Sequence, residues 1–381
     1  MTMVEKPAKQ SYFADMAAKE AAAKRSTVAD KACQWVVNNQ ISWSAGLLAV
    51  IHGHDYLFAG GDSKLAHLQH RIPNDVQGRY ARGVHDVYFI LHWAIAFTLI
   101  RATIMYKILE PFAKWYGVKS IRKVTRFAEQ GWLTIYYILS NSAGLYVMYH
   151  NPHWMNTRQF WMNYPEGHRQ MSALMKSYYL IQMGFWVQQI FVLLIEERRK
   201  DFVVMFIHHI VTCNLMGWSL YTNYTRVGNA VLCCMDSSDI FLSGTKCMRY
   251  MGFERAAVVS FVVFIISWVY TRHYLYFKIT YSVFYETYDI LGPNTLWDAE
   301  SGAFYSRASI GGFTLLLCIL QVLIIYWFAL VLRIIYRIVT QNNLDDSRSD
   351  SEDGDDGAGN KAAGASSKST KRKSRSKSKD D

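Results

Sequence analysis

The sequence predicts an all-α protein that crosses a membrane about eight times. Of its 381 residues, 51% are hydrophobic and 15% aromatic. The apolar residues occur in long blocks instead of the one-sided stripes of soluble helices. A bilayer core of about 30 Å needs about 20 mostly apolar helical residues. Eight segments approach this length, roughly 41–59, 84–106, 132–150, 178–195, 202–221, 229–246, 257–277 and 309–338. The first and sixth are the weakest because they contain ionisable residues.

Composition divides the chain into four parts. Residues 1–40 are polar and rich in Ala and Lys, and we expect a flexible cytosolic arm without a removable signal peptide. Two spanning helices follow in 41–110, and residues 111–340 form the main membrane domain. Residues 341–381 comprise an acidic block, a spacer of small residues and a basic block. Such a tail has too little apolar surface to offset chain entropy and should be disordered.

The distribution of Lys and Arg predicts the topology, because short cytosolic loops are enriched in them. Basic residues collect at the amino terminus, in loop 107–131, at 198–200 and at 246–255. With eight spans these fall on one side, which puts both termini in the cytosol. The opposite loop 278–308 is less basic, although three arginines between 71 and 82 weaken the contrast. The net charge of +11 therefore reflects topology and attraction to anionic headgroups or an anionic substrate. Dispersed charges of this kind do not predict nucleic-acid binding.

Two adjacent histidines, His208 and His209, lie inside an apolar run. Ionisable groups in spanning helices are costly and indicate a functional site. Successive helical residues diverge by roughly 100°, so the two rings should border a cavity from different angles. If the helix enters near Phe202, His208 lies about 9 Å deep.

The following predicted helix carries two aspartates at a similar depth. It leaves the membrane near Lys246, which places Asp239 and Asp236 about 10 to 15 Å deep. Antiparallel neighbours would thus present imidazole and carboxylate groups at one level. A carboxylate partner would fix the imidazole tautomer and raise its basicity. A buried His–Asp clamp that merely joins two helices is the structural alternative.

A metal site is a weaker interpretation of the same residues. Adjacent histidines on one helix diverge and bind a single ion poorly, unlike an i, i+4 pair. Membrane desaturases resemble one another in several His-rich boxes, whereas this chain has a single His-His pair. We therefore predict no metal. Seven other histidines lie near the ends of predicted helices, where we expect their rings to be solvated: His52, His54, His85, His92, His150, His153 and His273.

The run 199–250 closely resembles the longevity-assurance motif of ceramide synthases, within the TLC family of multi-span proteins. The matching residues are Asp201-Phe202, Met205, His208-His209, Thr212, Asn223, Arg226, Gly228, the cluster Met235-Asp236-x-Ser238-Asp239, and Lys246. A weaker likeness covers about 120–340. No homeobox-like insertion is visible, as in fungal-type members. The tail segment 346–352 fits a pattern associated in animal relatives with partner choice.

The resemblance implies transfer of a fatty acyl group from acyl-coenzyme A to the amine of a sphingoid base, within a TLC bundle of six or more helices that encloses a hydrophobic tunnel. It implies His208, His209, Asp236 and Asp239 as catalytic residues. Arg198, Arg199, Lys200 and Lys246, with Asp201, are candidate substrate-binding residues. Because a thioester is already activated, no cofactor is needed, and acyl-coenzyme A is a co-substrate. Asn223 and Arg226 are expected to be structural.

Location and partners follow from the same resemblance. We expect an endoplasmic reticulum membrane protein that works as a homodimer or with a small regulatory membrane subunit. Ser347, Ser349 and Ser351 lie beside acidic residues and are candidate sites for an acid-directed kinase.

A non-catalytic TLC protein that binds, senses or moves lipid is the alternative function. A proton-coupled transporter is disfavoured because inverted repeats are absent from the sequence.

Overall fold

The computed structural model describes residues 28–58, 65–196, 201–298 and 300–341. The chain divides into two compact units, residues 1–320 and 321–381. The described part of the second unit is the end of helix α14, residues 321–341. The predicted disordered tail beyond residue 341, with its three candidate phosphorylation sites, lies outside the described residues.

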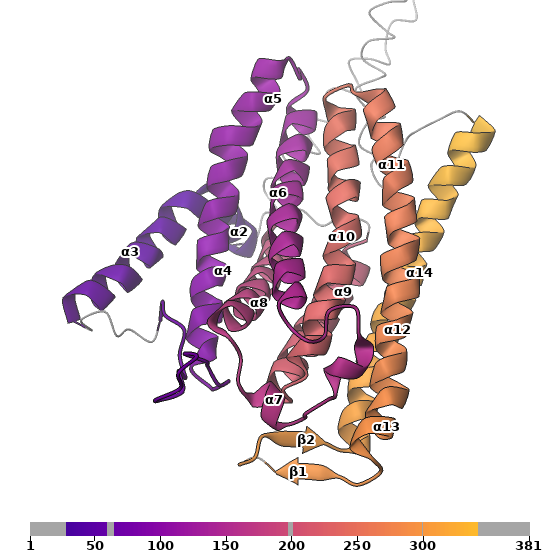
Figure 1. The fold of residues 1–381 in the computed structure, drawn as a ribbon. Coiled ribbons are helices and arrows are strands. Elements are labelled where there is room, and N and C mark those ends of the chain that lie inside the picture. Colours follow the sequence, from indigo (N-terminus) through magenta and orange to yellow (C-terminus); the bar gives the residue numbers. More distant parts are fainter. Residues whose placement is uncertain (1–27, 59–64, 197–200, 299, 342–381) are drawn as a thin grey trace, which may run out of the picture. The chain divides into compact units, whose positions relative to one another are not determined.

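The described chain is all-α apart from one short hairpin (Figure 1). Its first half contains α2 (Val28–Asn38), α3 (Gln40–Phe58), α4 (Asp86–Thr103), η1 (Ile104–Leu109), α5 (Glu110–Tyr116), α6 (Ile121–Tyr149), η2 (Thr157–Phe160), α7 (Glu166–Arg169) and α8 (Ala173–Ile195). Its second half contains α9 (Phe202–Tyr221), α10 (Thr225–Tyr250), α11 (Glu254–Trp268), η3 (Val269–Leu275), α12 (Tyr276–Tyr281), η4 (Ser282–Glu286), α13 (Thr287–Leu291), β1 (Leu296–Asp298), β2 (Ala303–Tyr305) and α14 (Arg307–Gln341).

A helix covers each of the eight segments predicted from the sequence. Five stretches of the described chain are long and apolar enough to cross a membrane: Asp86–Tyr116, Ala173–Ile195, Phe202–Tyr221, Glu254–Leu291 and Arg307–Arg337. The protein is therefore a polytopic helical membrane protein. Helices α3, α6 and α10 carry more polar residues, and the total of eight spans stays a prediction.

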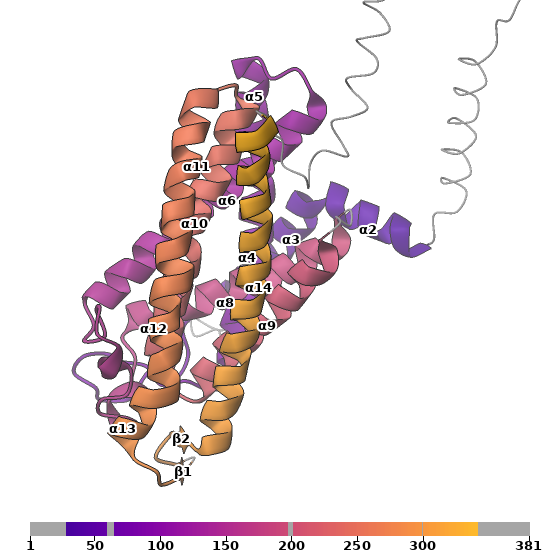
Figure 2. The same cartoon turned by 90° about the vertical axis from the view of Figure 1, so that its right-hand side faces the viewer.

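Three segments expected to be irregular are helical. Residues 28–38 of the predicted flexible arm form α2. The predicted loop 107–131 breaks only around Gly117, whose positive φ of 104° ends α5. The predicted loop 278–308 is helical as far as Leu291 and then forms the β1–β2 hairpin, with Trp297 opposite Phe304. Figure 2 shows α11 to α13 following one another along a single helical path.

Helices α6, α8 and α10 pack around an aromatic core. Tyr136 stacks on Phe185 and lies edge-on to Phe97. A Cβ atom at Gly144 would lie 2.5 Å from the hydroxyl of Tyr178 and 2.7 Å from Sγ of Cys233, so only glycine permits this approach of the three helices. Lipid tails are as apolar as these side chains, and close packing with interhelical hydrogen bonds is what favours association.

The turns after α5 and after α10 lie together, and we call this the basic end. Phe127 and Val124 of α6 form a buried cluster with Ala113, and Met251 packs against it. Gly252 ends α10 with a φ of 83°. Both turns were predicted to share one side of the membrane from their Lys and Arg content, and the structure confirms that they share one end of the bundle.

The opposite end, which we call the sheet end, gathers the hairpin, residues 150–172 and the turn 222–224. The hydroxyl of Tyr164 donates to the carbonyl of Thr222 at 3.0 Å and accepts from the amide of Phe304 at 2.8 Å. Asn223 donates to the carbonyl of Gly302, and Arg226 donates to the carbonyl of Gln159. These contacts fit the structural roles expected for the two motif residues.

One histidine at the sheet end corrects the expectation of solvated rings. His153 is 1% exposed, and its Nε2 lies 2.9 Å from Oδ1 of Asn229. Because that oxygen can only accept, Nε2 carries the hydrogen. The position near a helix end did not reveal this burial, since residues 150–172 fold back onto α10.

Candidate active site

The two adjacent histidines project from α9 against a tryptophan of α8. The ring centres of His208 and His209 are 5.6 Å apart, with planes at 84°. Trp186 meets both rings edge-on, at 5.4 Å from His208 and 5.5 Å from His209. His209 and Trp186 are buried, and His208 is half-buried. One indole therefore fixes the packing of both imidazoles.

The ring of His209 is oriented by the main chain. Its Nδ1 lies 2.5 Å from the carbonyl oxygen of Met205, one turn earlier on α9. A carbonyl oxygen only accepts, so Nδ1 carries the hydrogen, and Nε2 of the neutral ring holds a lone pair. We expected a carboxylate to be the partner of an imidazole in this pair. The partner of His209 is instead the main-chain carbonyl of Met205. The ring keeps the tautomer that a base or nucleophile requires.

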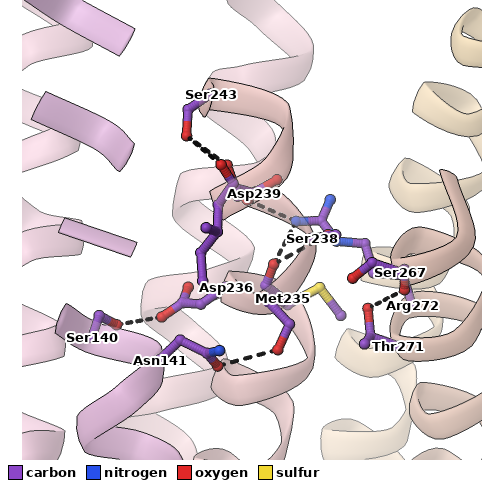
Figure 3. A network of polar contacts seen from close by, with 12 residues as sticks. Ser140, Asn141, Met235, Asp236, Ser238, Asp239, Ser243, Ser267, Thr271 and Arg272 are labelled. Atoms are coloured by element: carbon purple, nitrogen blue, oxygen red, sulfur yellow. Dashed lines mark hydrogen bonds and ion pairs between the residues drawn. The ribbon is translucent and has the colours of Figure 1, made fainter. Parts of the chain in front are cut away.

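Asp236 lies at the meeting point of α6, α8 and α10. It is 1% exposed. Ser140 donates to its carboxylate (Figure 3), and Gln182 donates to it at 3.0 Å. Gln182 also donates to Ser140 and accepts from Tyr136. Neutral donors thus hold this carboxylate, and the chain of hydrogen bonds ties three helices together.

Asp239 points towards a different neighbour, although it lies only three residues further along α10. Its carboxylate oxygen Oδ2 is 2.7 Å from Nη2 of Arg272 on η3 (Figure 3). The side chain of Asp239 is 21% exposed and that of Arg272 is 7% exposed. The two aspartates were expected to share a helix face. In the structure they face separate partners, one neutral and one cationic.

Helix α8 links the acidic residues to the histidines. Gln182, which binds Asp236, and Trp186, which contacts both imidazoles, are four residues apart on one helix face. Four residues span about 6 Å along a helix axis. The histidines and Asp236 therefore lie near one level of the bundle. Within the described chain, neither aspartate makes a hydrogen bond or ion pair with these rings.

The candidate substrate-binding residues are only partly described. Arg198, Arg199 and Lys200 fall outside the described residues. Asp201 precedes α9 directly, and its carbonyl accepts from the amide of Met205. Lys246 lies half-buried on α10, two turns beyond Asp239. These two residues flank the His–Asp level on the side of the basic end.

Two cavities of the described chain lie among loops. One, of about 330 Å³, is lined by residues 71–75. The other, of about 490 Å³, is lined by Ile72, Ala81, Glu166, Arg169 and Gln170. Neither includes a histidine of the pair, and the acyl tunnel stays a prediction.

The sequence patterns did not point to three residues of this region, Trp186, Gln182 and Arg272. Arg272 lies inside the predicted span 257–277, where an ionised side chain calls for a buried partner. Gln182 lies inside the predicted span 178–195, and its polar side chain likewise requires a buried partner. Trp186 carries no comparable signal, because an aromatic residue in a spanning helix is ordinary.

Known proteins resemble this chain over most of its length. The TLC domain family matches residues 126–333. Sphingosine N-acyltransferase lag1 of Schizosaccharomyces pombe is 41% identical over 281 residues, covering 74% of this chain and 71% of the relative. Ceramide synthase LAG1 of Saccharomyces cerevisiae is 33% identical over 333 residues, covering 85% and 79%. Sphingosine N-acyltransferase-like protein ALT7 of Alternaria alternata is 37% identical over 307 residues, covering 74% and 70%.

Proposed function

Because the chain belongs to the ceramide synthase family of TLC-domain proteins, we propose that it transfers a fatty acyl group from acyl-coenzyme A to the amine of a sphingoid base. The product is a dihydroceramide or phytoceramide with a long or very long acyl chain. The observation that most directly supports this proposal is the pair of imidazoles packed on Trp186 near the level of Asp236.

The reaction asks little of the protein beyond proton transfer and positioning. A thioester is already activated, so in this proposal neither a cofactor nor a metal takes part. One histidine accepts a proton from the substrate ammonium, and the neutral amine then attacks the thioester carbonyl. The carbon–sulfur bond breaks, the leaving thiolate takes up that proton, and the nitrogen of the new amide releases its second proton to water. The products are the amide and free coenzyme A.

His209 is suited to this task by its local geometry. With Nδ1–H donated to the carbonyl of Met205, Nε2 is available as a base. The same lone pair could attack the thioester to give an acyl-imidazole, which the amine would then cleave. Mass spectrometry of protein treated with acyl-coenzyme A alone distinguishes these routes, because only the second adds an acyl group to a histidine peptide.

The acidic residues and the basic entrance complete the proposed site. Asp236 and Asp239 stabilise positive charge that develops at the imidazole. Arg198, Arg199, Lys200 and Lys246 meet the phosphates of the coenzyme, and Asp201 lies beside them. The acyl and sphingoid chains occupy an apolar tunnel open to the bilayer.

We also propose that the enzyme resides in the endoplasmic reticulum membrane with both termini in the cytosol. It would act as a homodimer or with a small regulatory subunit. An acid-directed kinase would modify Ser347, Ser349 and Ser351. Crosslinking of the purified complex and phosphopeptide mapping test these two points separately.

The decisive experiment is an assay with purified full-length protein, sphinganine and a panel of acyl-coenzyme A esters, read by mass spectrometry. His208→Ala and His209→Ala should each reduce N-acyl product by at least about 100-fold while the protein stays monodisperse. His150→Ala is the matched control, because Nδ1 of His150 makes the same contact with a carbonyl one turn earlier, Tyr146, at the exposed end of α6.

The outcomes separate the two candidate functions. Full activity in both histidine variants would reject the proposed site. Lipid binding without turnover by the wild type, together with large stability losses in both variants, would instead identify a non-catalytic TLC protein in which the histidines hold helices together.

A further inference from the structure

Arg272 is a cation enclosed within a long apolar helix. It lies in η3, the π-helical turn between α11 and α12, and is 6% exposed. The stretch Glu254–Leu291 is long and apolar enough to cross a membrane. An ionised side chain in such a place is costly, so it requires partners that compensate for the lost solvent. Single π-helical turns of this kind are frequent at functional sites.

The guanidinium of Arg272 contacts one turn of α10 and its own helix. Nη2 lies 2.7 Å from Oδ2 of Asp239 and donates at 2.7 Å to the carbonyl of Met235 (Figure 3). Met235 and Asp239 are four residues apart, so one nitrogen holds both ends of a helical turn. The guanidinium also lies 4.0 Å from the ring centre of Trp268. The turn between Met235 and Asp239, which Arg272 contacts at both ends, contains Asp236.

Asp236 and Asp239 contact different helices on the two sides of α10. Asp236 is held by the neutral donors Ser140 and Gln182 from α6 and α8. Asp239 is paired with a cation from η3 on the other side of α10. A turn fixed from both sides cannot rotate without breaking one of the two sets of contacts. Arg272 therefore acts on the position of the acidic turn as a whole.

We infer that Arg272 is a positioning residue for acyl transfer, holding the Asp236–Asp239 turn in register with the histidines by its ion pair to Asp239. This inference rests on the proposed function. The guanidinium takes no part in bond making or breaking. Its loss should lower the rate of the chemical step and leave substrate binding nearly unchanged.

The test compares turnover per monodisperse protein for Arg272→Met, Arg272→Lys and Asp239→Asn. Arg272→Met should lower kcat about 100-fold, as a displacement of about 1 Å does, with KM for both substrates within about twofold. Arg272→Lys keeps the charge opposite Asp239 and should recover part of kcat. Lys278→Met is the control, because Lys278 stacks on Tyr274 at 5.0 Å on the same helical path but is exposed.

A double variant keeps the test valid if Arg272→Met alone does not fold. Arg272→Met with Asp239→Asn removes both charges and avoids an unpaired buried ion. It should be as active as Asp239→Asn alone, because Arg272 acts through that carboxylate. Wild-type kcat in Arg272→Met, or a double variant more than about tenfold below Asp239→Asn, would overturn the inference. An inactive wild type would instead reject the proposed function.

Discussion

Gln182 on α8 donates a hydrogen bond of 3.0 Å to the carboxylate of Asp236 on α10. One turn further along α8, Trp186 contacts both imidazoles of the histidine pair. Helix α8 therefore holds the acid and the histidines from a single face, and substitutions at these two positions separate the contribution of each contact.

Removing the amide of Gln182 should weaken the fold at the meeting point of three helices. Gln182→Leu leaves Asp236 with one donor and Tyr136 without its acceptor. Losing a partner of a buried polar group costs about 1 to 3 kcal/mol of unfolding free energy. Denaturation in mixed micelles measures it. Gln189→Leu, on the same helix, removes an amide that donates to Gln188 instead, and equal losses in the two variants would contradict this account.

Replacing Trp186 should reduce activity more than stability when the new residue is aromatic. Trp186→Phe keeps much of the buried ring but loses part of the contact with both imidazoles, so kcat should fall roughly 10- to 100-fold. Trp186→Ala also leaves a cavity and should cost about 3 to 5 kcal/mol. Assays and thermal melts measure the two effects. Trp115→Phe, at an 80% exposed position, should change neither, and an unaltered kcat in Trp186→Phe would refute the role given to the indole.

A buried ion pair outside the site makes a separate stability prediction. Nζ of Lys176 lies 2.7 Å from Oδ1 of Asp86, with side chains 0% and 3% exposed, and it donates to the carbonyl of Ala81 at 2.6 Å. Lys176→Met leaves a buried carboxylate unpaired and should cost about 3 to 5 kcal/mol. The double variant Lys176→Met with Asp86→Leu should recover most of that loss in the same unfolding assay.

An exposed pair provides the contrast for this ion pair. Lys114 lies 3.6 Å from Glu110, and its side chain is 60% exposed. Lys114→Met should change the unfolding free energy by less than about 1 kcal/mol. If Lys176→Met were equally mild, the pair with Asp86 would not be what secures the start of α4 to α8.

Acidification should destabilise the sheet end. Burial is the largest cause that lowers the pKa of His153 and of His168 from 6.5 to about 4. Between these values the unfolded chain binds more protons than the folded one, so stability falls as the pH drops from about 6.5 to about 4. Melting temperatures across this range measure the effect. His153→Asn combined with His168→Gln should flatten the dependence, and an unchanged slope would exclude both rings as its source.

The helices were predictable because long apolar blocks need no tertiary information to be recognised. The predicted segment 202–221 agrees with α9, whose bounds are Phe202–Tyr221. Residues 278–291 were expected to belong to a loop that follows the predicted span 257–277 and carries Glu286 and Asp289. They are helical because Tyr276, Ile279 and Val283 recur on one face that is buried against the protein, a pattern that average polarity conceals.

The candidate site was only partly predictable. The spacing from the ends of the predicted helices placed His208, His209, Asp236 and Asp239 near one level, and the contacts of α8 support that placement for the two histidines and Asp236. Which way each carboxylate points depends on neighbours that are distant in sequence, Gln182 for Asp236 and Arg272 for Asp239. The partner of Nδ1 of His209 is a carbonyl of its own helix. A pattern of side-chain types does not predict a main-chain partner.

The hydrogen bonds that join the loops at the sheet end bear on the side from which a reactant enters the protein. Tyr164, Asn223 and Arg226 are bonded to carbonyls of three separate segments, and Trp161, Tyr224 and Tyr305 beneath them are at most 1% exposed. In the proposed reaction, a hydrophilic reactant as bulky as a nucleotide thioester would have to break these contacts to enter from the sheet end. The protein would draw that reactant from one compartment only and return the spent carrier to the same side.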